Sequence, residues 1–267
     1  MLGDSAFAMQ DLPAQSVDLL FTSPPYCNAR PEYAEYATYA DYLAKMGRVF
    51  KEAHRVLNEG RFIVINASPV LIPRASRGAS SQRLPIPFDF HRLLTDAGFD
   101  FMDDIVWVKP EGAGWAVKRG IRFAADRQPL QYKPALVTET LLVYRKHTDK
   151  LLDWNIRTHD QELVKASYID DPYEETNVWH ISPTSDPRHP AVFPDALAER
   201  VLRYYSFKGD VVLDPFAGIG TVGRVASRLE RRFLLIDSDP EYVEIMKAVL
   251  IWFMLTDSIE AHSCPTT

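Results

Sequence analysis

Cysteine is scarce in this sequence, and its scarcity narrows the classes of protein to which the chain can belong. The 267 residues include only two cysteines, Cys27 and Cys264. Two cysteines can form neither a disulfide framework nor a cysteine-based zinc site, so a reduced, cytoplasmic setting is the default expectation. We predict no metal site from the sequence.

Long apolar runs are also missing. The longest one near the C-terminus covers residues 248–255 and is too short to cross a bilayer. The first residues, Met1 to Asp4, lead directly into domain-like sequence without a secretory signal pattern. We therefore expect a cytoplasmic protein that does not associate with membranes.

Positive charge is not in excess, since the formal net charge is −6 and the isoelectric point is about 5.7. This balance argues weakly against nucleic acid as a partner, because neutralising phosphates requires lysine and arginine. The basic residues are nevertheless clustered in residues 73–92 and 109–133, among glycines and, in the second segment, aromatic rings. Such clusters are typical of a surface that binds a polyanion, although on charge alone solvated loops are equally consistent. The side chains expected on this surface are Arg74, Arg77, Arg83, Lys118, Arg119, Arg122 and Arg127.

The composition is that of a globular protein, and the order of its elements is that of an α/β domain. Hydrophobic residues make up 46% of the chain and charged residues 25%, which predicts one large domain, or one domain with a small insert. Apolar runs bounded by turn residues predict strands at residues 17–21, 61–66, 104–109, 138–144, 210–214 and 232–236. Apolar periodicity predicts helices at residues 41–57, 88–97 and 194–205, after the glycines near residue 220 and at residues 240–250. The first two strands enclose a helix and should be parallel.

The first strand ends abruptly at Thr22-Ser23-Pro24-Pro25-Tyr26. Consecutive prolines lack N–H groups and fix φ, so they continue neither a helix nor a strand. We expect a stiff turn at the carboxyl end of a strand, where open α/β sheets bind their ligands. Ser23 adds a hydroxyl and Tyr26 a flat ring, while backbone carbonyls remain available as acceptors. The combination suits a planar molecule with an exocyclic amine, whereas a purely structural turn is the more common role of an isolated motif.

A second candidate site is the turn Gly218-x-Gly220-x-x-Gly223. It follows a strand and opens a helix, and Asp237 lies 19 residues after Gly218, as in dinucleotide-binding folds. A nicotinamide-dependent oxidoreductase is therefore one interpretation. Asp214 and Phe216 argue against it, because a pyrophosphate would be repelled by the carboxylate and crowded by the ring. A ligand with an amine and no phosphates, such as S-adenosyl-L-methionine, suits this turn better.

These motifs resemble those of the amino-directed DNA methyltransferases of the permuted β type. Ser23-Pro24-Pro25-Tyr26 resembles their catalytic motif, and Phe216-x-Gly218-x-Gly220 resembles their S-adenosyl-L-methionine motif. Stretches that agree in the same order are Gly3-Asp4, Trp107-x-Lys109, residues 138–146 and His189-Pro190-Ala191-Val192-Phe193-Pro194. The resemblance implies a doubly wound, Rossmann-like α/β sheet with one antiparallel strand, circularly permuted so that the catalytic half comes first and the cofactor half last.

The resemblance also implies direct methyl transfer to a base that has flipped out of duplex DNA. The catalytic residues would be Ser23, Pro24, Pro25 and Tyr26, with the base stacked on Tyr26 and its amine donating to Ser23 and to the Pro24 carbonyl. The cofactor would contact Asp4, Thr22, His189, Phe193, Asp214, Phe216, Gly218, Gly220, Thr221 and Asp237, with Asp237 on the ribose hydroxyls. A packed or capping His189 and a structural Lys109 are equally consistent with the sequence.

Ser23 narrows the target base. In this family, serine before Pro-Pro-Tyr usually accompanies methylation of cytosine N4, whereas aspartate or asparagine accompanies that of adenine N6. The prediction is therefore a DNA cytosine-N4 methyltransferase, with an adenine-N6 methyltransferase as the nearest alternative. An oxidoreductase or a cofactor-binding module without catalysis are the alternatives of another class. Methylation of cytosine C5 is excluded, because it needs a cysteine nucleophile, typically after a proline, and Cys27 follows Tyr26.

The expected organisation has four parts. They are a catalytic half at residues 1–145 with DNA-facing basic loops at 73–92 and 109–133, an insert or connection at 146–186, a cofactor half at 187–250 and a tail at 251–267. The insert is a candidate for target recognition, although its acidic residues favour the two basic loops. The partners that the family suggests are double-stranded DNA, a second copy of the chain and a cognate restriction endonuclease acting on the same site, in a prokaryotic cytoplasm.

Overall fold

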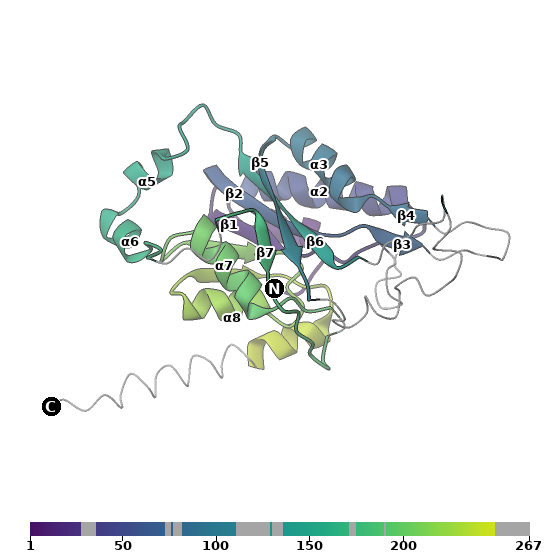
Figure 1. The fold of residues 1–267 in the computed structure, drawn as a ribbon. Helices are drawn as coiled ribbons and strands as arrows, with labels where there is room; N and C mark the ends of the chain where they lie inside the picture. Colours follow the sequence, from purple (N-terminus) through teal and green to yellow (C-terminus); the bar gives the residue numbers. More distant parts are fainter. Residues whose placement is uncertain are drawn as a thin grey trace.

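A seven-stranded sheet with the strand order β7-β5-β6-β2-β1-β8-β9 forms the centre of the molecule (Figure 1). The computed structural model describes residues 1–27, 36–72, 76, 82–110, 129, 136–170, 175–189 and 191–248. Strand β6 runs antiparallel to both of its neighbours, and the other pairs of adjacent strands are parallel. The predicted α/β sheet with one antiparallel strand is therefore confirmed.

The elements follow one another largely as the sequence predicts. The strands of the sheet are β1 (Val17–Thr22), β2 (Leu57–Ala67), β5 (Phe99–Val108), β6 (Thr138–Lys146), β7 (Val178–His180), β8 (Val211–Asp214) and β9 (Arg232–Leu235), and a separate hairpin consists of β3 (Val70–Ile72) and β4 (Gln82–Leu84). The helices are α1 (Ser5–Ala8), the 3-10 helix η1 (Met9–Asp11), α2 (Tyr39–Val56), α3 (Ile86–Asp96), α5 (Trp154–Thr158), α6 (Gln161–Ala166), α7 (Asp195–Tyr205) and α8 (Thr221–Arg228), with a further helix at residues 240–248.

The first β-α-β unit shows why these residues form these elements. A capping box begins α2: the Thr38 hydroxyl accepts from the Asp41 N–H at 3.1 Å, and the Asp41 carboxylate accepts from the Thr38 N–H at 3.0 Å. Strands β1 and β2 on either side of this helix are parallel, with Leu20 opposite Ile63. The parallel arrangement expected of a β-α-β unit is confirmed.

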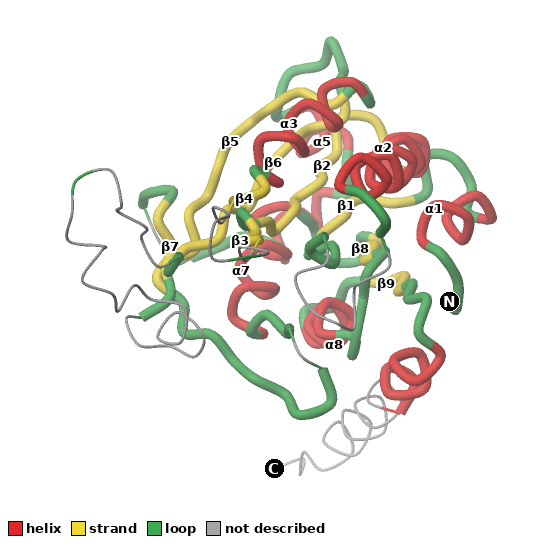
Figure 2. The backbone as a smooth tube through the Cα atoms, turned by 90° about the vertical axis from the view of Figure 1, so that its right-hand side faces the viewer, coloured by secondary structure: helices red, strands yellow, loops and turns green. Residues whose placement is uncertain are grey.

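Helices cover both faces of the sheet. Helices α2 and α3 lie on one face and α7 and α8 on the other (Figure 2). Leu20 of β1 packs into the first of these two cores, while Leu19 and Phe21 pack into the second, because successive side chains of a strand point to opposite faces. Burial on both faces explains the continuous apolar run that predicts β1.

Two parts of the sheet differ from the prediction. Strand β5 begins at Phe99 rather than at residue 104, and its residues 100–104 are exposed, so no apolar run marks this part of the strand. Strand β7 has only three residues and pairs with the end of β5, with Val106 opposite Val178. Such a short strand carries too little periodicity to be predicted. Among the described residues, no helix is both long and apolar enough to cross a membrane.

Candidate functional site

The two turns singled out in the sequence lie at the same end of the sheet. Parallel strands β1, β2, β8 and β9 all finish at this end, which we call the carboxyl end of the sheet. Because β6 is antiparallel, it begins here: Thr140 near its start lies opposite Ala67, the last residue of β2. The turn at residues 23–26 (the Pro-Pro turn) follows β1, and the turn at residues 215–220 (the Gly-rich turn) follows β8, the adjacent strand.

A buried hydrogen bond joins the starts of these two turns. The Thr22 hydroxyl donates to Asp214 Oδ1 at 2.6 Å, and the Phe216 N–H donates to the same oxygen at 3.0 Å. Both Thr22 and Asp214 are 1% exposed. Burial raises the pKa of Asp214 to about 7, although the bonds from Thr22 and Phe216 act in the opposite direction. Asp214 therefore shapes the Gly-rich turn from its buried side.

The Pro-Pro turn is held by side chains from two other strands. Ser23 Oγ accepts from Asn66 Nδ2 of β2 at 3.3 Å, and the Tyr26 hydroxyl donates to Glu139 Oε2 of β6 at 3.0 Å. Burial, followed by the nearby charge of Glu139, raises the pKa of Tyr26 well above its usual value, so the phenol keeps its proton. Among the described residues, none donates a hydrogen bond to the Pro24 carbonyl. This carbonyl and the Ser23 hydroxyl are the acceptors that the sequence predicts at this turn.

Asn66, Glu139 and Lys109 complete the group of polar side chains around the Pro-Pro turn. The sequence prediction does not include Asn66 or Glu139. Glu139 Oε2 also accepts from Asn66 Nδ2 at 2.5 Å, and Glu139 Oε1 forms an ion pair with Lys109, the residue that follows β5. Lys109 also lies over the ring of Trp107, with Nζ 4.5 Å from its centroid. The sequence gives only a weak indication of Asn66 and Glu139. Asn66 ends an apolar run, and Glu139 is a charged residue near the start of an apolar strand.

The Gly-rich turn and the first part of α8 need glycine for two different reasons. Gly218 and Gly220 have φ values of +51° and +81°, in the left-handed region that favours glycine. Gly223 lies in α8, where a Cβ would come within 2.5 Å of Leu235 Cδ1 on β9. Gly220 is the N-cap of α8, and Thr221, its first residue, is buried. Glycine at these positions therefore permits the left-handed turn and the close packing of α8 on β9.

Asp237 lies directly against the Gly-rich turn. Its carboxylate accepts from the Gly218 N–H at 2.8 Å and from the Asp239 N–H at 2.9 Å. Burial raises the pKa of Asp237, whereas these backbone bonds lower it. Each carboxylate oxygen has a second lone pair, so two hydroxyl groups of a ligand can still bind. The N-terminal segment also contacts Asp237, since the Gly3 N–H donates to the Asp237 carbonyl at 2.9 Å.

His189 and Phe193 approach the same turns from the segment before α7. A Cβ on Gly218 would lie 2.9 Å from His189 Nε2, and the His189 ring packs on Tyr242 with centroids 4.7 Å apart. His189 Nδ1 also accepts from the Ala191 N–H at 3.1 Å. Phe193 packs on Phe21 of β1, with ring centroids 5.2 Å apart. His189 thus has the packing contacts that the sequence left open and lies beside the Gly-rich turn as well.

Asp4 caps a helix and forms an ion pair at the same end of the sheet. It is the N-cap of α1, where Oδ1 accepts from the Ala6 N–H at 3.0 Å, and Oδ2 forms an ion pair with Lys45 of α2 at 3.0 Å. The next residue, Ser5, donates to the Pro215 carbonyl at 2.5 Å. Asp4 therefore lies near the Gly-rich turn with both carboxylate oxygens already bonded.

The predicted DNA-facing side chains can be placed only in part. Arg83 is exposed on β4, and the β3–β4 hairpin continues from the carboxyl end of β2. The other six residues, Arg74, Arg77, Lys118, Arg119, Arg122 and Arg127, lie outside the described residues, as do residues 73–75 and 77–81 of the first basic loop and most of the second.

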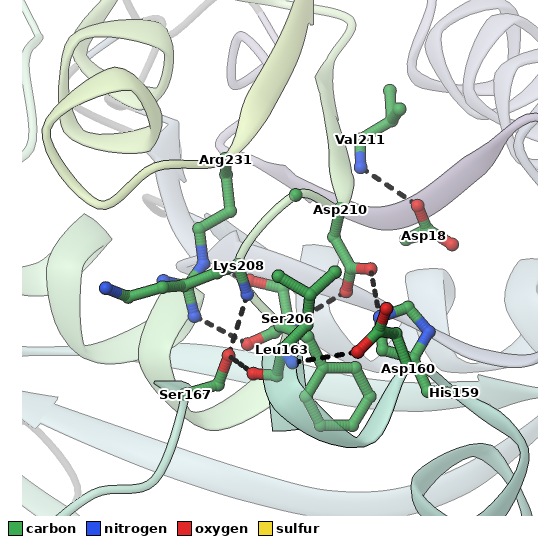
Figure 3. A network of polar contacts seen from close by, with 12 residues as sticks. Asp18, His159, Asp160, Leu163, Ser167, Ser206, Lys208, Asp210, Val211 and Arg231 are labelled. Atoms are coloured by element: carbon green, nitrogen blue, oxygen red, sulfur yellow. Dashed lines mark hydrogen bonds and ion pairs between the residues drawn. The ribbon is translucent and has the colours of Figure 1, made fainter. Parts of the chain in front are cut away.

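Residues 146–170, at the start of the predicted insert, lie at the opposite end of the sheet. Figure 3 shows the polar network that fixes them there, around Asp210, the residue before β8. The His159 ring stacks on Phe207 with centroids 4.7 Å apart, and Ser167 Oγ accepts from the Lys208 N–H at 2.8 Å. Asn155 donates to the carbonyl of Gly60, near the start of β2, at 3.0 Å. Helices α5 and α6 therefore lie at the amino ends of the parallel strands, on the side of the molecule away from β3 and β4 (Figure 1).

The polar groups at the two turns are of kinds that suit amines and hydroxyl groups. Residues 214–223 contain carboxylate, ring and backbone groups but no lysine or arginine. Among the described residues, no group of three or more His, Cys, Asp or Glu side chains could hold a metal ion. Acceptors at the Pro-Pro turn and carboxylates at the Gly-rich turn suit one molecule with an exocyclic amine next to another with hydroxyl and amine groups.

Comparison with protein families matches residues 17–248 to a family model described as DNA methylase, of the N6/N4 type. Among known proteins, the chain is similar to the type II methyltransferase M.BglII of Bacillus subtilis. The two are 27% identical over 262 residues, which cover 93% of this chain and 67% of that protein.

Solved structures give the same fold. TTHA0409 from Thermus thermophilus is 28% identical with a TM-score of 0.73, covering 94% of this chain and 93% of that one, and it has also been solved with S-adenosyl-L-methionine. The PvuII DNA methyltransferase (cytosine-N4-specific) is 23% identical with a TM-score of 0.68, covering 92% of this chain and 83% of that one. At that identity the second likeness shows the fold alone.

Proposed function

The chain belongs to the N6/N4 DNA methylase family, and we propose that it transfers a methyl group from S-adenosyl-L-methionine to the N4 amine of cytosine in duplex DNA. The observation that carries this proposal is the hydrogen bond of 2.6 Å between Thr22 and Asp214. It places the Pro-Pro turn, with its acceptors for an amine, directly beside the Gly-rich turn. A donor and an acceptor of a methyl group need this adjacency, because reacting atoms must be held close together and aligned.

The residues at the Gly-rich turn fit S-adenosyl-L-methionine. The absence of lysine and arginine from residues 214–223 suits a ligand without phosphates, and the carboxylates suit its hydroxyl groups and positive charge. Asp237 would bind the ribose hydroxyls, Phe216, Gly218, Gly220 and Thr221 would line the turn, and His189 and Phe193 would lie near the methionine part. Asp214 and Thr22 would support the turn from its buried side, and Asp4 would act through its cap on α1.

At the Pro-Pro turn, the chain's own groups hold the target. The flipped cytosine stacks on Tyr26, while its amine donates to the Pro24 carbonyl and to Ser23. When bound, S-adenosyl-L-methionine supplies an electrophilic methyl group on its sulfonium. Because the two acceptors bind the amine hydrogens, they direct the nitrogen lone pair toward that methyl group. No covalent bond between enzyme and base is needed, so Cys27, which is buried, takes no part.

The DNA would approach the carboxyl end of the sheet from the side of the β3–β4 hairpin. Arg83 is exposed there, and the remaining basic residues of the loops at 73–92 and 109–133 would extend the same surface, with arginine and guanine as the usual base contact. Helices α5 and α6 lie at the other end of the sheet. The two basic loops are therefore a better candidate for target recognition than residues 146–186.

Ser23 favours cytosine N4 over adenine N6 as the acceptor. Both bases present an amine next to a ring nitrogen on the same edge, so the Pro24 carbonyl can serve either one. The distinction rests on serine in place of the aspartate or asparagine that usually accompanies adenine methylation. Membership of the N6/N4 DNA methylase family argues against the alternative of a nicotinamide-dependent oxidoreductase. The type II relatives further suggest a cognate restriction endonuclease for the same DNA site.

A transfer assay tests the proposal. Duplex DNA is incubated with the protein and S-adenosyl-L-methionine that carries a tritiated methyl group, and the labelled nucleoside is identified after digestion. Label in N4-methylcytosine is the expected result. Label in N6-methyladenine would instead establish the alternative, and no label in DNA would overturn both.

A further inference from the structure

The Glu139 carboxylate gathers groups from three other parts of the chain behind the Pro-Pro turn. Its Oε2 accepts from the Tyr26 hydroxyl at 3.0 Å and from Asn66 Nδ2 at 2.5 Å, and its Oε1 pairs with Lys109. These partners come from the turn after β1, from β2 and from the residue after β5. The contacts can form only because antiparallel β6 begins where the parallel strands end.

Glu139 and Lys109 form a partly buried ion pair. The side chains of Glu139 and Lys109 are 16% and 25% exposed, so either charge without the other would be costly to desolvate. Because the Glu139 carboxylate pairs with Lys109 and accepts from Tyr26 and Asn66, its lone pairs are largely satisfied. Hydrogen bonds to a charged acceptor are stronger than those between neutral groups, so the carboxylate holds Tyr26 and Asn66 firmly.

Glu139 also determines how the Asn66 amide is turned. An amide oxygen facing a carboxylate would be repelled, so the Nδ2 side must face Glu139. In this orientation the second Nδ2 hydrogen is directed to Ser23 Oγ, at 3.3 Å. Asn66 is 1% exposed and has little freedom to turn in any other way. The charge on Glu139 therefore reaches Ser23 through one intervening side chain.

We propose that Glu139, neutralised by Lys109, is a positioning residue that fixes the orientations of Tyr26 and Ser23 for the incoming base. This rests on the proposed function of the same site. Glu139 does not contact the base itself. It sets the tilt of the Tyr26 ring through the phenol oxygen, and it sets the polar environment of the Ser23 hydroxyl through Asn66.

Two single substitutions separate this role from a merely structural one. Glu139→Gln removes the charge that pairs with Lys109 and weakens the bonds from Tyr26 and Asn66, and Asn66→Asp places a carboxylate opposite a carboxylate. A general loss of packing would lower kcat and cofactor affinity together, whereas misplaced Tyr26 and Ser23 side chains would lower kcat alone.

The experiment starts from the wild-type protein, whose transfer of tritiated methyl groups to DNA establishes the activity itself. If the wild type labels no DNA, the proposed function fails before the role of Glu139 is in question. If it does, kcat and the affinity for S-adenosyl-L-methionine are measured for both single variants and for Glu162→Gln. Glu162 is a matched control, because it pairs with Lys165 on exposed α6 at the other end of the sheet.

We expect each single variant to lower kcat about 10- to 100-fold, the loss that follows a misplacement of about 1 Å, with cofactor affinity within about two-fold of wild type. Glu162→Gln should match wild type. A Glu139→Gln protein with unchanged kcat would overturn the proposal. So would a loss of cofactor affinity equal to that of kcat.

Should Glu139→Gln fail to fold, Tyr26→Phe gives a second measurement, because it deletes only the hydroxyl that Glu139 binds. We expect a loss in kcat of about ten-fold, in line with one hydrogen bond to a charged group, with cofactor affinity unchanged. A Tyr26→Phe protein with wild-type kcat would contradict the positioning role.

Discussion

The Thr22 hydroxyl donates to the Asp214 carboxylate at 2.6 Å, across 192 residues of sequence. Thr22 is the last residue of β1 and immediately precedes the Pro-Pro turn, and Asp214 is the last residue of β8 and immediately precedes the Gly-rich turn. One buried hydrogen bond therefore fixes the position of the proposed base site relative to the proposed cofactor site. The catalytic half and the cofactor half of this permuted chain lie far apart in the sequence, and this bond connects them directly.

Replacing Thr22 by valine should destabilise the protein and weaken the cofactor site. The substitution keeps the shape of the side chain but removes its hydroxyl, leaving a buried carboxyl with one donor fewer. Losing a partner of a buried polar group costs about 1–3 kcal/mol, which denaturant unfolding measures as a lower midpoint. Thr22→Ser, which retains the donor, is the control. Equal stability of the valine and serine variants would show that the hydrogen bond contributes nothing.

Asp214 should make the free energy of unfolding depend on pH in a way that an ordinary aspartate does not. Its folded pKa is about 7, against 3.8 for an ordinary aspartate, so between about pH 4 and pH 7 the folded protein binds a proton that the unfolded chain has released. The contribution is fully present below about pH 4 and is lost as the pH rises through about 7, amounting to roughly 4 kcal/mol at most. The free energy of unfolding should therefore fall with rising pH more steeply in wild type than in Asp214→Asn.

The measurement is denaturant unfolding of both proteins at intervals from pH 4 to 8. Subtracting the Asp214→Asn curve removes the contribution of all other groups that titrate in this window. Parallel curves for the two proteins would contradict the raised pKa.

Gly218→Ala should weaken binding of S-adenosyl-L-methionine. At φ +51° a Cβ is strained, and here it would also lie 2.9 Å from His189 Nε2, so the turn or the histidine must move. We expect a loss of about 1–2 kcal/mol in stability from the left-handed backbone and a weaker affinity in calorimetric titration.

Gly47→Ala provides the matched control. Gly47 lies inside α2, where a Cβ would meet Leu93 Cδ2 at an ordinary 3.6 Å. Alanine in a helix should add about 1 kcal/mol of stability and leave cofactor affinity unchanged. If both alanine variants bind the cofactor like wild type, the Gly-rich turn is not the cofactor site.

Arg83→Ala and Arg157→Ala test which end of the sheet faces DNA. Arg83 is exposed on β4, at the carboxyl end, and Arg157 is exposed on α5, at the amino end. If Arg83 contacts a phosphate, its removal should weaken DNA binding and reduce the slope of log K against log salt by about 1. Arg157→Ala should change neither quantity. The opposite pattern in fluorescence anisotropy titrations would place the DNA on α5 and α6.

The sequence predicts the fold well because its strands are buried on both faces. Continuous apolar runs such as residues 17–21 mark their strands, and the Pro-Pro and Gly-rich motifs mark the turns that follow them. Strand β7 and the first half of β5 are not predictable in this way, since one is very short and the other is exposed.

The site is predictable where local geometry forces a residue type, and not where distant residues meet. Gly218 and Gly220 have to adopt left-handed conformations, and this requirement is visible in one short motif. Asn66 lies beside the Pro-Pro turn through the predicted pairing of β1 with β2, whereas Glu139 reaches it only through the pairing of β6 with β2 and β5. No pattern near Glu139 reveals the pairing of β6, so its contribution required the structure.

The most direct test of the central claim is to map modified bases in a bacterial host that expresses the wild-type protein and in one that expresses Ser23→Ala. Transfer to cytosine N4 predicts N4-methylcytosine at one recurring DNA sequence with wild type, and its loss or strong reduction with Ser23→Ala at equal protein level. N6-methyladenine at a recurring sequence, or N4-methylcytosine that persists undiminished with Ser23→Ala, would contradict the assignment of this chemistry to the Pro-Pro turn.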